Sequence, residues 1–342
     1  MTVSRKNKNM KKSSKIQRKQ SKLQKKNKSR KQIKIMNHMS GGNPKLIQDY
    51  IDKIEKNLIT ELDFNLGNEL FDLFLKEPNL FNMLIPALKN NTSIHKLILP
   101  SILNHMIFNE EYLNILFKTN TTITQLNLTG NSLSIDKLPN IFQSKFITEL
   151  NLSECRFLPS DLAKALETNS TLEVLNLTNV CIIGLRSNGC KVISEAIKNN
   201  PNTKIHTLIL DDNNINKETD KGIESLANLL LSNTTIKHLS LQENQLNNNV
   251  LYIFKDVFST NTSLEFLDLS DTAIYDLKII LSALNNNTKS NMTINLIRQH
   301  DDVKSIEEQL LPKSLEECPM INNIKLIIDL RKFDKAKKEL KL

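Results

Sequence analysis

The most regular feature of this sequence is a short alternation of apolar and polar positions that recurs along its middle. The repeated pattern is L-x-x-L-x-L-x-x-N, in which Ile is allowed at the first position. Clear copies begin at Ile94, Ile123, Ile147, Leu172, Ile205, Ile236 and Leu264. Because side chains alternate between the two faces of a β-strand, each copy predicts a strand with one buried face.

The segments between these strands favour helices. In the segment 222–233, apolar residues recur at intervals of three and four positions. This stripe consists of Ile223, Leu226, Ala227, Leu230 and Leu231. Such spacing places the apolar side chains on one face of a helix. A unit of one strand and one helix cannot bury its apolar face alone, so neighbouring units are expected to stack into one continuous core.

This repeat resembles the leucine-rich repeat. Its strand-plus-helix unit of 24 to 33 residues is similar to the ribonuclease-inhibitor-like subclass, which includes tropomodulins, the Ran GTPase-activating protein and the sensor domains of NOD-like receptors. The resemblance implies an α/β solenoid with a curved parallel sheet inside and helices outside. Residues 91–300 would hold about seven to eight such units. Degenerate copies of the pattern begin at Ile59 and Met292.

One polar position of the repeat is expected to be structural. The asparagine position is occupied by Asn131, Cys155, Asn213 and Asn244. The resemblance implies that a buried amide at this position satisfies backbone groups in the turn after the strand. Val180 and Thr272 depart from the pattern. We expect the turns at these two residues to be looser or differently bonded.

A second set of asparagines precedes the strands. Tripeptides of the N-glycosylation type begin at Asn91, Asn120, Asn169, Asn233 and Asn261. Each stands just before a copy of the repeat, so we interpret these asparagines as residues that end one helix and turn the chain into the next strand, with positive φ. Glycosylation is the alternative, but the N-terminal residues lack the apolar segment of a secretory signal.

Both ends of the repeat region predict caps. Residues 43–90 favour a helical N-terminal cap, in which Asn43 can cap a helix that has Pro44 at its first position. Residues 301–342 are charged and are expected to form a helical C-terminal cap. Because the two ends of a stacked solenoid are otherwise open, such segments would cover them.

The charge is unevenly distributed. Residues 1–48 contain sixteen Lys and Arg and no acid, whereas residues 49–342 contain 30 basic and 37 acidic residues. Residues 1–42 therefore predict a disordered basic tail. Three roles stay open for it: a solvated tail with nuclear-import character, salt-sensitive contact of residues 5–34 with RNA or another nucleic acid, and contact with an anionic membrane surface.

Candidate binding residues flank the two leucines of each strand, where side chains would point to the concave face of the sheet. The predicted protein-binding residues are Gln125, Asn127, Glu149, Asn151, Asn176, Asp211, His238, Ser240, Gln242, Phe266 and Asp268. His238 and Phe266 are the candidate anchors, because aromatic residues concentrate binding energy. The three asparagines on consecutive strands predict either an amide ladder or polar contacts to a partner.

Little in the sequence favours catalysis. It contains no phosphate-binding, dinucleotide-binding or hydrolase motif, and its six histidines and four cysteines lack metal-ligand spacing. No apolar run of about eighteen residues predicts a transmembrane segment. We expect a non-enzymatic intracellular scaffold, cytoplasmic or nuclear, that binds a protein partner without a cofactor. Two alternatives stay open: a regulator of a small GTPase, implied by the similarity to the Ran activator, and an RNA- or ribosome-associated protein acting through the tail.

Overall fold

The computed structural model describes residues 43–65, 71–72, 81–100, 111–180, 185–216, 218–274, 282–283, 287, 289–296 and 325–327. The chain divides into two compact units, Met1–Asp52 and Lys53–Leu342, and each is considered by itself. The described residues of the first unit belong to helix α2, which spans Asn43–Glu55.

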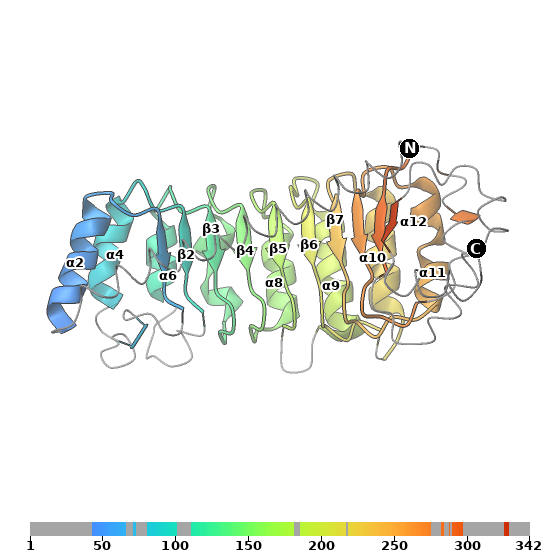
Figure 1. Cartoon of the computed structure of the whole chain (residues 1–342), viewed down its shortest axis with the longest axis horizontal. Coiled ribbons are helices and arrows are strands. Elements are labelled where there is room, and N and C mark those ends of the chain that lie inside the picture. The colour runs from blue at the N-terminus through green and yellow to red at the C-terminus, as the bar shows by residue number, and fades with distance from the viewer. Residues whose placement is uncertain are drawn as a thin grey trace, which may run out of the picture. The chain divides into compact units, whose positions relative to one another are not determined.

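The second unit is built on a parallel sheet of ten strands (Figure 1). The strands are β1 (Glu61–Asp63), β2 (Lys96–Ile98), β3 (Gln125–Asn127), β4 (Glu149–Asn151), β5 (Val174–Asn176), β6 (Thr207–Ile209), β7 (His238–Ser240), β8 (Phe266–Asp268), β9 (Thr293–Asn295) and β10 (Lys325–Ile327). Each strand pairs with the next one along the chain. From β1 to β9 the sheet therefore grows by one strand per copy of the sequence pattern, the degenerate copies included.

The leucines at the centres of the strands form one buried row. Leu126, Leu150, Leu175, Leu208, Leu239 and Leu267 are direct partners on successive strands. Each is at most 2% exposed. The alternation in sequence has thus placed these leucines on the covered face of the sheet. The prediction of an α/β fold with a parallel sheet and alternating strands and helices is confirmed.

Helices connect the strands and cover one face of the sheet (Figure 1). They are α4 (Phe81–Asn90), α6 (Glu111–Phe117), α7 (Pro139–Phe142), α8 (Pro159–Leu166), α9 (Arg186–Asn199), α10 (Lys221–Ser232), α11 (Asn249–Ile253) and α12 (Lys255–Thr260), with a short 3-10 helix η2 (Ile135–Lys137). We call the opposite side of the sheet the open sheet face. It carries the first and third residues of each strand and the residue two positions beyond the strand.

The apolar stripe predicted for residues 222–233 is correct except at one position. Leu231 is 46% exposed, whereas Leu229 is fully buried. The reason is close contact between α10 and α9: a Cβ atom added to Gly222 would lie 2.8 Å from the carbonyl oxygen of Ser187. Leu229 lies two turns from Gly222 on the same flank of the helix, so it is buried against α9, and Leu231 lies on the other flank.

The described strands extend beyond the predicted solenoid limits. β1 lies within residues 43–90, which were expected to be a helical cap, and follows the degenerate copy at Ile59. At the other end, residues 301–342 were expected to be helical, but Lys325–Ile327 form strand β10. The rest of this segment lies outside the described residues, as do the basic tail 1–42 and its predicted contacts. The domain limits themselves stay predictions.

Buried asparagines join successive units where the helices end. Asn91, Asn120, Asn169 and Asn261 are 3 to 6% exposed. The Oδ1 of Asn169 accepts hydrogen bonds from the backbone N–H groups of Thr171 and Leu172 at 3.2 and 2.9 Å. Its Nδ2 donates to the carbonyl oxygen of Phe142, in the preceding unit, at 2.7 Å. The nitrogen that would carry a sugar is therefore buried and already bonded in this structure.

The expectation that these asparagines adopt positive φ was wrong. The φ angle is −82° at Asn233 and −71° at Asn261. The position requires the amide group and not an unusual backbone conformation. Positive φ occurs instead at the residue just before the repeat asparagine position, as in Gly130, Glu154, Asp212 and Glu243.

The repeat asparagine position is buried and bonds to the backbone of neighbouring turns. Asn131 donates through Nδ2 to the carbonyl oxygens of Leu99 and Leu128, at 2.8 and 2.6 Å. Cys155 donates through Sγ to the carbonyl oxygen of Leu128 at 2.9 Å. The thiol thus makes the same kind of bond to the preceding unit as the amide does.

Two units use other bonds at this position. Val180 has no side-chain donor; its backbone N–H donates to the Oδ1 of Asn213 in the next unit at 3.1 Å. The hydroxyl of Thr272 donates to the carbonyl oxygen of Leu269 at 2.7 Å. Asn244 follows the main pattern, since its Nδ2 donates to the carbonyl oxygens of Leu210 and Leu241 at 2.8 and 3.0 Å. The turns at Val180 and Thr272 are therefore differently bonded.

Candidate functional site

The predicted binding residues gather on the open sheet face. The strand register makes direct partners of Gln125 and Glu149, of Asn127, Asn151 and Asn176, of His238 and Phe266, and of Ser240 and Asp268. Asp211 and Gln242 lie two residues beyond the ends of β6 and β7. Because these positions alternate with buried leucines, their side chains share the face that the helices leave uncovered. They extend over strands β3 to β8.

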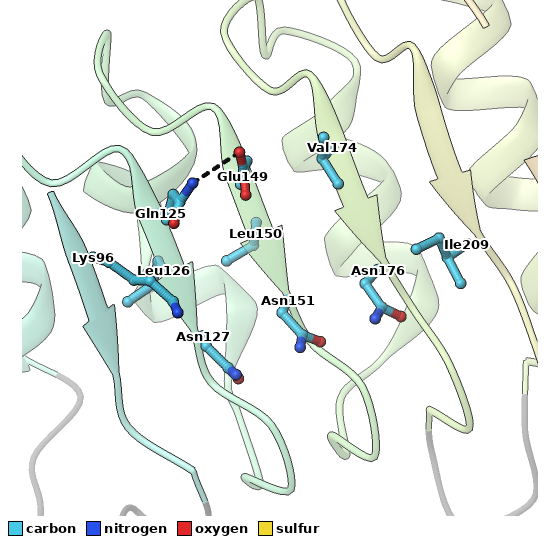
Figure 2. Close-up of a pocket in the computed structure, with 10 residues that line it drawn as sticks. All are labelled: Lys96, Gln125, Leu126, Asn127, Glu149, Leu150, Asn151, Val174, Asn176 and Ile209. Carbon is cyan, nitrogen blue, oxygen red and sulfur yellow. Dashed lines mark hydrogen bonds between the residues drawn. The ribbon is translucent and has the colours of Figure 1, made fainter. Parts of the chain in front are cut away.

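A shallow depression of about 230 Å³ lies on this face over strands β2 to β6 (Figure 2). Its polar lining consists of Lys96, Gln125, Asn127, Glu149, Asn151 and Asn176, and its apolar lining includes Val174 and Ile209. The Nε2 of Gln125 donates to the Oε1 of Glu149 at 3.0 Å. The Nζ of Lys96 donates to the Oε1 of Glu61 at 3.0 Å. With one cation and one carboxylate in its lining, the depression has a formal charge of about zero.

The amides of three asparagines lie side by side in this depression (Figure 2). The Oδ1 of Asn127 accepts from the backbone N–H of Thr129 at 2.9 Å. Asn151 and Asn176 make the equivalent bond, at 2.9 Å each, to the residue two positions later. The amide oxygens are thus used within each unit, and they do not form a ladder across the strands.

Carboxylates are frequent on the part of the open sheet face formed by strands β6 to β8 and by the residues that directly follow them. The Oδ1 of Asp211 accepts from the hydroxyl of Ser240 at 2.5 Å and from the backbone N–H of Gln242 at 3.0 Å. Burial raises the pKa of the Asp211 carboxyl; the two hydrogen bonds oppose this rise, and the charges of Asp268 and Glu243 add to it. Among the described residues, no Lys, Arg or His forms an ion pair with Asp211 or Asp268.

An aromatic pair lies on the same part of the face. The rings of His238 and Phe266 meet edge to face, with centroids 6.4 Å apart and an interplanar angle of 83°. At its rim, Glu265 pairs with Lys237 at 2.8 Å. The hydrogen bond and charge of Lys237 lower the pKa of the Glu265 carboxyl. The face therefore combines an aromatic pair and carboxylates near its C-terminal strands with aliphatic and neutral polar side chains in the depression.

Reactive groups are scarce in the part of the chain that the structure describes. Burial raises the pKa of the Cys190 thiol to about 12, against a weaker opposing hydrogen bond with Ser194. This thiol is therefore protonated at neutral pH and is a poor nucleophile. In the same described ranges, His, Cys, Asp and Glu side chains nowhere gather in threes suited to a metal ion. Nor does any helix there have the length and apolar character needed to cross a membrane.

The chain matches no protein-family model, and no curated protein matches it in sequence. The resemblance to leucine-rich repeats thus stays a prediction from the repeat pattern.

Residues of this face that were not predicted to bind a partner include Lys96, Val174 and Ile209, which line the depression. Asn295 of β9 donates through Nδ2 to both carboxylate oxygens of Asp268 at 3.0 Å. Its signal in the sequence was the degenerate copy that begins at Met292, which places Asn295 at the same strand position as Asp268.

Proposed function

We propose that this chain is a leucine-rich repeat protein of the ribonuclease-inhibitor-like subclass, and that it is a non-enzymatic scaffold binding a protein partner on its open sheet face. The observation that carries the proposal is the difference between the two faces of the sheet. One face is covered by helices, whereas the other presents partly exposed side chains on successive strands.

The composition of the open sheet face supports binding to a protein. The five strand spacings from β3 to β8 span about 24 Å, which is enough for a folded domain or an extended segment. Neutral polar groups supply adaptable contacts, and the His238–Phe266 pair supplies an aromatic anchor. The depression, at about 230 Å³, is smaller than the pockets that usually enclose small ligands, which begin at about 300 Å³.

Site-specific photo-crosslinking tests this function. A photoreactive amino acid is placed at Val174, in the depression, and separately at Leu231, which is 46% exposed on α10. The Val174 version should capture a protein partner in cells, and the Leu231 version should not capture the same one. Capture from Leu231 alone, or equal capture from both positions, contradicts the proposal.

A combined variant of the open sheet face provides a second test. It carries alanine at Glu149, Asn151, Asn176, Ser240 and Phe266. The variant loses the local hydrogen bonds of Asn151, Asn176 and Ser240, so its fold is first verified by circular dichroism. The folded variant should lose the partner. If the folded variant recovers an unchanged set of partners, the open sheet face is not the binding surface.

A further inference from the structure

The three amides of the depression are oriented hydrogen-bond donors. In Asn127, Asn151 and Asn176, the Oδ1 atom is occupied by the backbone N–H two residues later. This bond fixes the amide plane and identifies the remaining atom as nitrogen, because a backbone N–H needs an oxygen acceptor. No described residue accepts a hydrogen bond from any of the three Nδ2 groups. They are available to a ligand that supplies acceptors.

The charge of the depression favours neutral acceptors. Lys96 is already paired with Glu61 at 3.0 Å, and the Glu149 carboxylate stands beside the amides. An anionic ligand would be repelled by Glu149 without gaining a free cation. Backbone carbonyl groups are neutral acceptors, so a polypeptide segment fits this chemistry better than a phosphate or carboxylate does.

The spacing of the amides selects one backbone conformation. Adjacent strands lie about 4.8 Å apart, so Asn127 and Asn176 are separated by about 9.6 Å. Carbonyls on one side of a β-strand repeat every two residues, about 6.7 Å. In a polyproline-II helix they repeat every three residues, about 9.3 Å, and they make no internal hydrogen bonds. Such a helix lying across the strands presents carbonyls to the two outer amides, with Asn151 opposite the backbone between them.

The apolar lining agrees with this occupant. Val174 and Ile209 lie beside the amide row, on β5 and β6 (Figure 2). Proline rings can pack against such aliphatic side chains. A proline-rich segment is also extended before it binds, so it loses less conformational entropy on binding than a flexible segment does.

We propose that the depression binds an uncharged, proline-rich segment of a protein partner in the polyproline-II conformation, through hydrogen bonds from Asn127 and Asn176 to its backbone carbonyls, with Asn151 facing the backbone between them. This inference rests on the proposed function and specifies which partner chemistry the open sheet face accepts.

The direct test uses the full chain and two peptides that carry the same neutral fluorophore. One is deca-proline, and the other is a Gly-Ser decapeptide with as many backbone carbonyls. We expect deca-proline to bind at least about tenfold more tightly, measured by fluorescence anisotropy. Equal affinities, or no binding of deca-proline, overturn the inference.

The matched variant replaces the three asparagines by aspartate. Asp retains an oxygen for the local bond, as Asp268 shows by accepting from the backbone N–H of Ser270 at 2.9 Å, but it removes the donors. The triple variant places carboxylates at directly paired positions, so its thermal unfolding midpoint should fall while it stays folded at the assay temperature. It should lose at least about tenfold in affinity for deca-proline. The control Asn202→Asp, at an exposed position outside the open sheet face, should bind deca-proline as the unaltered chain does. Unchanged affinity in the triple variant contradicts the role of the amides.

The two proposals fail in different ways. If crosslinking at Val174 captures a partner but the triple variant binds deca-proline normally, only the polyproline-II inference fails. If Val174 captures nothing and Leu231 captures the partner, the proposed docking face itself fails, whatever the peptide affinities are.

Discussion

The Oδ1 of Asn151 accepts a 2.9 Å hydrogen bond from the backbone N–H of Ser153, two residues further along the chain. The bond closes a local turn at the end of β4 and directs Nδ2 away from the backbone. Because Asn127 and Asn176 repeat this geometry, a structural bond in each unit creates a row of donors on the surface. The stability of the repeat and the proposed binding therefore depend on the same side chains.

The first prediction separates the two roles of Asn151. Asn151→Asp keeps an acceptor for the Ser153 N–H, so the free energy of unfolding should change by less than about 0.5 kcal/mol. Asn151→Leu removes the acceptor and should destabilise the fold by about 1 kcal/mol. Chemical denaturation of both variants checks this. Equal losses would show that the local bond does not matter.

The second prediction concerns the asparagines at the helix ends. Asn169→Ala leaves the carbonyl of Phe142 and two backbone N–H groups without partners in a buried site. We expect a loss of about 2 to 4 kcal/mol in the free energy of unfolding. Asn202→Ala, at an exposed position, is the control and should change it by less than about 0.5 kcal/mol. Similar values for the two variants would argue against a structural role for Asn169.

The third prediction concerns the contact between α9 and α10. A Cβ atom at position 222 would lie 2.8 Å from the backbone oxygen of Ser187, which cannot move independently of its helix. Gly222→Ala should therefore destabilise the fold by about 1 to 3 kcal/mol. In Gly189→Ala the nearest atoms, at 3.2 Å, belong to the Leu185 side chain, so the loss should be smaller. Thermal unfolding of both variants compares them, and a larger loss at Gly189 would contradict the packing argument.

The fourth prediction concerns pH. Burial and the charges of Asp268 and Glu243 raise the pKa of Asp211, so the folded state holds this proton more tightly than the unfolded state does. The resulting stabilisation is complete below the ordinary aspartate pKa of about 3.9 and is lost as the pH rises through the raised pKa. The side chain of Asp211→Asn does not ionise, so this variant has no stabilisation of this kind to lose as the pH rises. The variant should gain stability relative to the unaltered chain across this pH range and then keep a constant difference, as measured by denaturation at a series of pH values. A difference that shrinks as the pH rises would contradict the assignment.

The alternation of leucines predicted the sheet and its register, because a shift of one residue would expose the whole leucine row. The sequence could not assign Leu231 and Leu229 to opposite environments, since that depends on the close contact at Gly222 between two helices. Strand β10 was missed because a short apolar segment among charged residues carries no repeat.

The binding residues were predictable only in part. Strand alternation placed Asn127, Asn151 and Asn176 on one face. Whether their amides would bond to each other or to the backbone depends on side-chain rotation, which the pattern does not determine. Val174 and Ile209 became informative only when the depression brought them beside the amides.

The most direct test of the account is the affinity of the crosslinked partner for two single variants, measured by calorimetry. Val174→Glu places a charge in the depression, and Leu231→Glu places one on the exposed flank of α10. The account predicts at least about tenfold weaker binding for Val174→Glu and an unchanged affinity for Leu231→Glu, measured where both variants are folded. Leu231→Glu should unfold at the temperature of the unaltered chain, and Val174→Glu below it, because its carboxylate lies opposite that of Glu149. Unchanged binding by Val174→Glu, together with weakened binding by Leu231→Glu, would contradict it.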